Sequence, residues 1–217
     1  MSGKTRKKTD KKPLLKTNPK ALGKLTTLLR SVVSKIELPE ELPAFLGDTM
    51  PMDTLENYKE MILQGEKPEC AFYILRGFMW VYYFSDQEGE VITHFYGENM
   101  IVAFKDFLIK ADSGYTIVAG RETLVSTIRH DDMLRMYKKW PQMESFAKDV
   151  VMAYDKYSHL QQANLRSMGF KERIAEFYLF YPKLLPAKWA RVDDQVANYL
   201  GMGVRTLRKY RKLLGLK

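Results

Sequence analysis

The sequence contains a single cysteine, Cys70, among its 217 residues. One thiol excludes an internal disulfide framework, and it falls short of the four thiolates that normally hold an iron–sulfur cluster. No apolar run approaches the roughly 18 residues that a membrane-spanning helix needs, and the N-terminus lacks the apolar core of a signal peptide. These absences predict a soluble, cytoplasmic protein with no membrane contact.

Histidine is also scarce, which limits the metal chemistry available. A metal oxygenase site in a small β-barrel needs two histidines and a carboxylate that converge. His130 and Asp132 are the only neighbouring pair, and His94 would be a distant third ligand. No phosphate-binding loop, dinucleotide-binding glycine pattern or serine-nucleophile motif is present. We therefore predict no catalytic residue, no metal site, no cofactor and no enzymatic activity.

Positive charge is abundant, with 35 lysines and arginines against 26 acidic residues and a net charge of +9. Such an excess suits a polyanionic partner. Residues 1–20 concentrate it, because they hold eight basic residues and only one acidic residue, Asp10. A block of like charges is typical of a disordered tail, which we predict for residues 1–18. The tail could add nonspecific contacts to phosphates.

Short β-rich runs separated by turn signals fill the region from Met50 to Ile128. We expect strands at 58–63, 71–75, 78–84, 90–96, 100–104, 115–119 and 124–128. Strands of this length and spacing predict a jelly-roll or double-stranded β-helix barrel rather than a parallel sheet. In 78–84 both alternating faces are apolar, so one face should fill the barrel and the other should meet a helix. Flanking helices are expected at 19–36, between Pro39 and Pro43, and at 131–140, which gives one domain over 19–140.

A heptad-like stripe marks the next helix, predicted over 141–166. Its members recur at alternating intervals of three and four residues: Met143, Phe146, Val150, Ala153, Tyr157, Leu160 and Asn164. Such a stripe is typical of a dimer seam, in which Asn164 could fix the register. The alternative is that the stripe packs on the barrel of its own chain. We expect the dimer seam.

The last segment, 167–217, has the pattern of a helix-turn-helix domain after a hinge at Ser167–Gly169 and a helix at 170–180. Gly201 and Gly203 interrupt two helical periodicities, as a short turn between helices requires. Ala197 is small where two helices would cross closely. On the second helix, expected from Val204 to Leu214, apolar residues share one side and Arg205, Arg208, Lys209 and Lys212 share the other. The alternative is an ordinary solvated basic face.

The order of barrel, heptad helix and helix-turn-helix resembles the Crp/Fnr family of bacterial transcription regulators. The local strings that carry the resemblance are Gly65–Pro68, Phe72–Gly77, Val81–Tyr83, Gly89, Gly97–Asn99 and Lys171–Arg173. The match covers roughly residues 25 to 217 and is most similar to the branch found in Bacteroidetes. The resemblance implies an α+β fold with a cyclic-nucleotide-binding-like barrel, a homodimer along the central helix, and sequence-specific binding of double-stranded DNA. RNA polymerase and a small-molecule effector are further candidate partners.

The resemblance also implies an effector pocket at Gly97, Glu98, Ser113 and Tyr115. The family's pocket pairs the cyclic phosphate with an arginine, but residues 111–116 contain none, and Asp112 would repel a phosphate. We therefore expect an effector other than cAMP, or none. The resemblance leaves open a haem sensor that uses His94 or Cys70, but a lone histidine in an aromatic strand is more often a core or surface residue.

We expect the second helix of the pair to enter the major groove. Arg205, Arg208 and Lys209 should reach base edges or nearby phosphates, Lys212 should contact a phosphate, and Thr206 can serve either role. The family's usual Ser-Arg pair is replaced by Arg208 and Lys209, so the preferred DNA sequence cannot be carried over. The family's two-stranded wing after this helix is also missing from the sequence. The rival hypothesis is a ligand-binding or scaffold dimer with a degenerate helix-turn-helix that does not read DNA specifically.

Overall fold

A computed structural model of the chain describes residues 18–32, 36–185 and 190–216. The predicted tail, apart from Asn18, lies outside the described residues. Asn18 caps the first helix, because its Oδ1 accepts a hydrogen bond from the Lys20 backbone nitrogen at 2.8 Å. None of the described helices has the length and apolar character needed to cross a membrane.

Two antiparallel sheets form the centre of the molecule. The first has the strand order β1-β8-β3-β6 and the second β2-β7-β4-β5. The strands are β1 Met52–Leu55, β2 Lys59–Ile62, β3 Cys70–Arg76, β4 Met79–Ser85, β5 Gly89–Tyr96, β6 Ile101–Val102, β7 Thr116–Ala119 and β8 Thr123–Arg129. The expected strand at 100–104 is shortened to β6, because a short helix follows it at once. Strand β1 has no counterpart among the expected strands.

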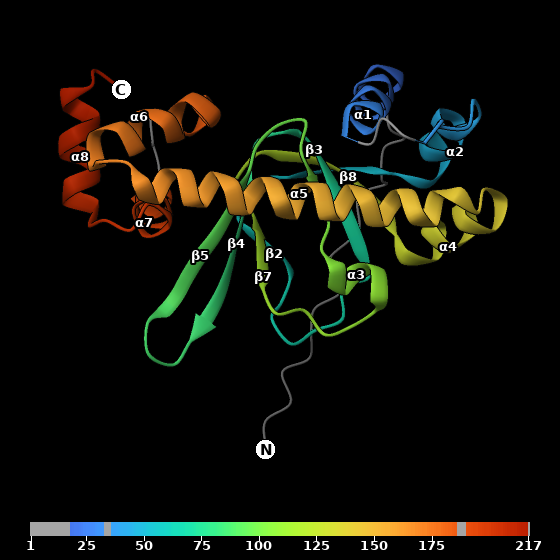
Figure 1. The fold of residues 1–217 in the computed structure, drawn as a ribbon, viewed down its shortest axis with the longest axis horizontal. Coiled ribbons are helices and arrows are strands. Elements are labelled where there is room, and N and C mark those ends of the chain that lie inside the picture. Colours follow the sequence, from blue (N-terminus) through green and yellow to red (C-terminus); the bar gives the residue numbers. More distant parts are fainter. Residues whose placement is uncertain (1–17, 33–35, 186–189, 217) are drawn as a thin grey trace.

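Helices surround this sandwich on two sides (Figure 1). They are α1 Pro19–Val32, α2 Leu42–Thr49, α3 Lys105–Ile109, α4 His130–Lys139, α5 Gln142–Ser167, α6 Phe170–Phe180, the 3-10 turn η1 Pro182–Leu184, α7 Ala190–Tyr199 and α8 Val204–Leu213. Figure 1 shows α5 running across the molecule, from α4 at one end to α6, α7 and α8 at the other. Helix α3 and η1 have no counterpart in the sequence prediction.

The interior of the sandwich is an apolar cluster from both sheets. Phe72 and Ile74 of β3 contribute from the first sheet, and Met79 and Val81 of β4 from the second; all four are at most 2% exposed. The outer face of the first sheet, with Ala71 and Tyr73, packs under α1, α2, α4 and the first half of α5. Burying this much apolar surface is the main force that holds the layers together.

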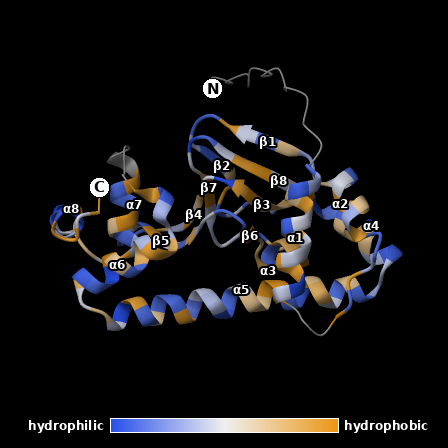
Figure 2. Cartoon of the chain, turned by 90° about the horizontal axis from the view of Figure 1, so that it is seen from above, coloured by the Kyte–Doolittle hydropathy of each residue, from blue (hydrophilic) through white to orange (hydrophobic). Residues whose placement is uncertain are grey.

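The outer face of the second sheet meets the C-terminal helices. Trp80 of β4 and Phe78, which directly precedes the strand, belong to the same buried cluster as Phe177 of α6 and Val196 of α7. Because β4 alternates between this cluster and the sandwich interior, the expectation that one face fills the barrel and the other meets a helix is confirmed. Figure 2 shows the resulting sequence of layers, with orange residues gathered between the sheets and their covering helices.

Candidate functional site

Helices α7 and α8 pack against each other across a tight turn. Gly201 in that turn adopts a φ of +64°, a left-handed conformation that glycine adopts without steric cost. The Met202 backbone nitrogen donates to the Ala197 carbonyl at 3.0 Å, which closes the turn. Ala197 is only 2% exposed and shares a cluster with Leu207 of α8, which is fully buried. The small residue and the glycine therefore lie where the sequence pattern placed them.

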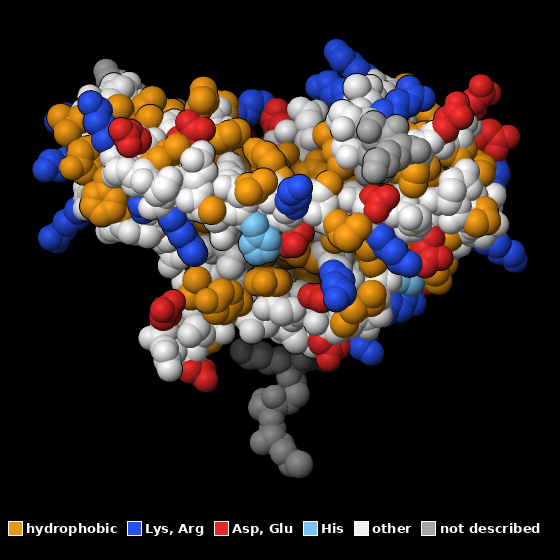
Figure 3. Space-filling model, viewed as in Figure 1, with side chains coloured by type: hydrophobic (Ala, Val, Ile, Leu, Met, Phe, Trp, Pro, Cys, Tyr) orange, Lys and Arg blue, Asp and Glu red, His pale blue; other side chains and the backbone are white. Residues whose placement is uncertain are grey.

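The outer face of α8 carries the basic side chains. Arg205, Lys209 and Lys212 are exposed, Arg208 is about half exposed, and Thr206 is partly buried. In Figure 3 blue side chains project from the edge of the molecule where α8 lies in Figure 1. The first turn of α8 contains no acidic residue. Since opposing charge is absent there, this face presents a positive surface to solvent.

A buried carboxylate, Asp193 of α7, holds two arginines of α8. Arg208 donates through Nε to Asp193 Oδ2 at 2.8 Å, and Arg211 donates to Oδ1 at 2.7 Å. The side chain of Asp193 is 3% exposed and that of Arg211 is 15% exposed. Charge-assisted bonds of this kind are short and directional. Arg208 is thus tethered at its Nε, while the rest of its guanidinium remains at the surface.

Arg211 also reaches the third helix of this unit, α6. Its guanidinium donates to the Tyr178 hydroxyl at 3.1 Å. Burial lowers the pKa of Arg211, but its hydrogen bonds to Asp193 and Tyr178 outweigh burial and raise it above the usual value. Neither Asp193 nor Arg211 is marked as a site residue by a pattern in the sequence. Asp193 forms its ion pairs with arginines that lie 15 and 18 residues further along the chain, and no local sequence pattern indicates such a pairing.

Arg173 of α6 joins the ends of two other helices. It donates to the Leu200 carbonyl at 2.6 Å, after α7, and to the Met168 carbonyl at 2.9 Å, after α5. Carbonyls at helix C-termini lack intrahelical partners, and a guanidinium can satisfy several of them at once. The string Lys171–Arg173 therefore has a physical role here: Arg173 fixes the C-terminal helices to the end of α5.

The C-terminal helices also cover the free edge of β5, which is the outermost strand of its sheet. Asn198 of α7 accepts from the Ile92 backbone nitrogen at 2.9 Å and donates to the Glu90 carbonyl at 2.8 Å. The Tyr181 hydroxyl donates to the Phe95 carbonyl at 2.7 Å. Burial raises the pKa of Tyr181 well above its usual value, so the hydroxyl keeps its proton for this bond.

A third contact to β5 comes from α5, where Gln162 Nε2 donates to the Thr93 carbonyl. Side chains from three helical segments thus take the hydrogen-bonding positions that another strand would occupy. An uncovered edge strand is open to pairing with other chains. The helix α8 consequently has a defined orientation relative to the sandwich, set through α7 and the β5 edge.

The seven residues of the predicted dimer seam divide into two groups. Met143, Phe146 and Val150 are at most 5% exposed and belong to the core beneath α1 and α2. These three side chains pack within their own chain, as the alternative interpretation of the stripe predicted, because the first half of α5 lies on the first sheet. Beyond them Ala153 is partly buried, Tyr157 and Leu160 are 43% and 61% exposed, and Asn164 is exposed.

The four residues of the predicted effector pocket do not converge. Glu98 accepts from the Gly77 backbone nitrogen at 3.2 Å and from Lys183 Nζ at 2.5 Å, beside Gly97 and η1. Ser113 is buried, and its hydroxyl donates to the Tyr115 carbonyl at 2.8 Å. Only Tyr115 of the four lines a different cavity, of about 570 Å³, between the sandwich and α5. The four residues therefore do not line one cavity in this structure, and the effector pocket inferred from the resemblance stays a prediction.

Metal-ligating side chains do not gather in groups of three or more anywhere in the described ranges. His130 packs edge-on against Phe107 with ring centroids 5.7 Å apart, and Asp132 pairs with Arg135 at 2.8 Å. His94 lines the cavity beside α5. Cys70, the single thiol, has its pKa raised to about 11 by burial, so it is protonated at neutral pH.

No protein-family model and no curated protein matches the sequence. Solved structures do match the fold. FixK2 from Bradyrhizobium japonicum aligns with a TM-score of 0.61 and 14% identity, over 77% of this chain and 85% of that chain. A cyclic nucleotide-binding domain from Methylobacillus flagellatus gives 0.59 and 13%, over 68% and 85%.

A third similar structure is CLP, described as a c-di-GMP responsive global regulator of Xanthomonas campestris. It aligns with a TM-score of 0.56 and 14% identity, over 80% of this chain and 90% of that chain. At these identities the similarity shows the fold: a cyclic-nucleotide-binding-like β-sandwich followed by a helical region. This confirms the predicted α+β class with its jelly-roll-like sandwich, at the level of the fold.

Proposed function

We propose that this protein is a sequence-specific DNA-binding transcription regulator of the Crp/Fnr type, and not an enzyme. The observation that carries the proposal is the basic outer face of α8. Its inner face packs on α7 and α6 through Leu207, while Arg205 and Lys209 stand exposed on the outside. An α-helix with this division fits the major groove of B-DNA, where arginine can pair with guanine.

Within this proposal, residues 19–140 form the sensor domain, 141–166 the dimerisation helix and 167–217 a helix-turn-helix domain. Residues 1–18 are a basic tail. The likeness in fold to FixK2 and CLP, over more than three quarters of this chain, supports the division. The protein would work in the cytoplasm, with RNA polymerase as a further partner. Its assignment to the Bacteroidetes branch of the family remains a prediction from the sequence alone.

The roles of the α8 side chains follow from their positions. Arg205 and Lys209 would reach base edges, Lys212 would contact a phosphate, and Thr206 would serve either role. Arg208 has a double role, since its Nε is held by Asp193 while its remaining donors can meet DNA. Asp193 therefore presets the direction of the arginine before DNA arrives, which lowers the entropy lost on binding.

A second copy of the chain would pack along the exposed part of α5. The seam in this proposal runs through Ala153, Tyr157, Leu160 and Asn164, because Met143, Phe146 and Val150 are already buried within the chain. Two parallel copies would place two α8 helices on one side, as paired half-sites require. The small-molecule effector, if the sensor domain has one, is other than cAMP.

The test is a selection of binding sites from random duplex DNA with the full-length protein, followed by affinity measurements across a salt series. We expect a two-fold symmetric motif with half-sites about one helical turn apart. Binding that is only salt-sensitive, with no enriched motif, would instead support the ligand-binding or scaffold dimer with a degenerate helix-turn-helix. In that case the basic residues would act as a nonspecific polyanion surface.

A further inference from the structure

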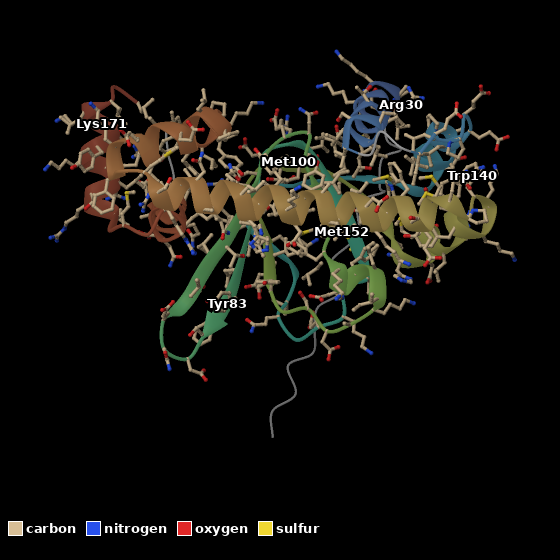
Figure 4. All side chains as sticks on the ribbon, viewed as in Figure 1. Arg30, Tyr83, Met100, Trp140, Met152 and Lys171 are labelled. Atoms are coloured by element: carbon tan, nitrogen blue, oxygen red, sulfur yellow. The ribbon has the colours of Figure 1, made fainter. Side chains whose placement is uncertain are left out.

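The cavity of about 570 Å³ between α5 and the sandwich has the size of a small-molecule site. Five aromatic rings line it: His94, Tyr96, Phe104 and Tyr115 on the side of the sandwich, and Tyr154 of α5. Aliphatic side chains from α3 and α5, including Leu108, Val151 and Met152, line the other side. Figure 4 shows Met152 on the side of α5 that faces the strands. Gly97, Glu98 and Ser113 are not among the lining residues.

A β-bulge directs His94 into this cavity. Val81 of β4 pairs with His94 and Tyr82 pairs with Ile92, so Thr93 is an extra residue in β5. Side chains alternate between the faces of a regular strand, so Ile92 and His94 would otherwise share a face. Ile92 lies in the cluster under the C-terminal helices, whereas Tyr96 lies in the sandwich interior. The bulge therefore turns His94 and Tyr96 inward.

Hydrogen bonds around Thr93 define the tautomer of His94. The Thr93 hydroxyl donates its hydrogen to the Val81 carbonyl at 3.2 Å. It must then accept from His94 Nδ1, which lies 2.8 Å away. Burial lowers the pKa of His94 to about 4, so the ring is neutral at neutral pH. With the proton on Nδ1, Nε2 is a hydrogen-bond acceptor, and among the described residues no donor to it is found.

The rings form flat, mutually perpendicular walls. His94 and Tyr96 are nearly parallel, with an interplanar angle of 15° and centroids 5.9 Å apart. Phe104 and Tyr115 meet the His94 ring edge-on, at 82° and 84° and at 6.0 and 6.4 Å. Aromatic ligands prefer such offset-stacked and edge-to-face contacts. The faces and edges of these rings thus form flat walls, which favour a planar aromatic ligand.

Three of the four charged side chains that line the cavity have partners of their own. Lys148 pairs with Glu144 at 2.8 Å, and Asp155 lies 3.5 Å from His159 Nε2. Asp106 accepts from the Gly114 backbone nitrogen at 3.3 Å. Lys105 is exposed. Lysines and aspartates are present in equal number, and no arginine lines the cavity. A charged ligand would therefore gain little here and would lose its hydration.

We propose that this cavity binds a planar, uncharged aromatic molecule that carries one N–H or O–H group, and that His94 Nε2 accepts its hydrogen bond. Ring contacts supply most of the affinity, and Nε2 supplies the selectivity, because a donor-free analogue would leave it unsatisfied. The ligand acts as an effector only if the regulator role proposed above holds. Its binding can be measured without DNA, so failure of one proposal is distinguishable from failure of the other.

The experiment compares indole with N-methylindole, which has the same ring system but no N–H donor. Binding to the full-length protein is followed by calorimetry and by the NMR signals of the histidine rings. We expect indole to bind roughly tenfold more tightly than N-methylindole, the effect of one buried hydrogen bond. Indole should also shift the signals of His94 and leave those of exposed His159 unchanged.

His94→Phe should remove the preference for indole, whereas His94→Gln, which keeps an acceptor oxygen, should retain part of it. His159→Phe is the matched control and should bind as the unchanged protein does. Circular dichroism checks that each variant is folded. The proposal is overturned if indole fails to bind the unchanged protein or if N-methylindole binds equally well. Tighter binding of benzoate, tetramethylammonium or cAMP than of indole would likewise overturn it, in favour of a charged ligand.

Discussion

Asn198 Oδ1 lies 2.9 Å from the backbone nitrogen of Ile92, so a side chain of α7 satisfies the edge of β5 as a neighbouring strand would. Its amide nitrogen meets the Glu90 carbonyl at 2.8 Å. Together these two bonds place the α7–α8 pair on the sandwich. They connect the part of the molecule that would bind DNA with the strand that carries His94.

Asn198→Ala should loosen this contact. Without the Asn198 side chain, the Ile92 N–H and the Glu90 carbonyl at the edge of β5 lose their hydrogen-bond partner. We therefore expect the free energy of unfolding to fall by about 1–3 kcal/mol. Hydrogen exchange of the Ile92 amide should speed up by more than that of the Val81 amide, which lies within the sheet. Gln87→Ala, in the exposed turn between β4 and β5, is the control and should change neither quantity. Unchanged exchange at Ile92 in Asn198→Ala would contradict the role of Asn198.

Asp193→Ala should destabilise the helices α6 to α8. The change leaves Arg211 largely buried without its carboxylate, and breaking a buried ion pair from one side costs about 3–5 kcal/mol. Urea unfolding measures the loss. The neighbouring change Asp194→Ala removes an exposed carboxylate of equal charge and should cost less than about 0.5 kcal/mol. Equal effects of the two substitutions would mean that the Asp193 network does not support the fold.

Arg205→Ala and Lys212→Ala should affect DNA binding in different ways. Loss of Arg205 should cost about 1–3 kcal/mol on the selected site and relax the preference at one base position. Loss of Lys212 should weaken binding on all sequences alike and flatten its salt dependence. Lys24→Ala, which removes a charge from α1, is the control. If Arg205→Ala weakens all sequences equally, Arg205 is a phosphate contact.

Leu160→Glu should separate the proposed dimer without unfolding the subunit. Leu160 is 61% exposed in the single chain, so a carboxylate there costs the subunit little, but two would face each other across the proposed seam. Sedimentation velocity should show a monomer with an unchanged circular dichroism spectrum. Leu179→Glu alters a side chain of α6 that is 74% exposed and should leave the dimer intact. A dimer that survives Leu160→Glu would place the interface elsewhere.

The stability of the protein should fall in acid partly because of His94. Burial lowers its pKa from 6.5 to about 4, against the opposing effect of Asp155 and with a further lowering by His159. Between pH 6.5 and about pH 4, His94 binds a proton in the unfolded chain but not in the folded chain. The free energy of unfolding therefore decreases as the pH drops through this range. The contribution is about 2–3 kcal/mol between pH 7 and pH 4.

His94→Gln removes this titrating group, so denaturant unfolding of the variant should lose correspondingly less stability over the same pH range. His159→Gln, at an exposed imidazole, should follow the unchanged protein. Parallel pH profiles for all three would show that His94 is not kept neutral by burial.

Local patterns in the sequence predicted the elements that depend on periodicity. Phe78, Trp80 and Tyr82 alternate with Met79 and Val81, and this alternation was sufficient to infer a strand covered on both faces. Gly201 and Ala197 similarly predicted the turn and close packing of α7 and α8. The stripe on α5 predicted the helix but not its partner, because apolar residues at heptad spacing pack equally well on a sheet or on a second helix.

Features that depend on distant contacts had no local signal. Thr93 has the character of an ordinary strand residue in the sequence, and the β-bulge at this position is defined only by the pairing of β5 with β4. Gly97 and Glu98 matched a family string, yet Glu98 pairs with Lys183, which is 85 residues away in the sequence. Asp193 likewise looks like a surface carboxylate at the start of a helix. Only the assembled fold shows which of these polar groups is buried and what satisfies it.

The covered edge of β5 has a consequence for how the chain can be divided. A fragment that ended after α5 would keep the sandwich but expose Phe78, Trp80 and Phe95 to water, together with the unpaired backbone of β5. Such a surface recruits strands from other molecules. The isolated sandwich should therefore self-associate, because the C-terminal helices cover its aggregation-prone surface in the whole chain.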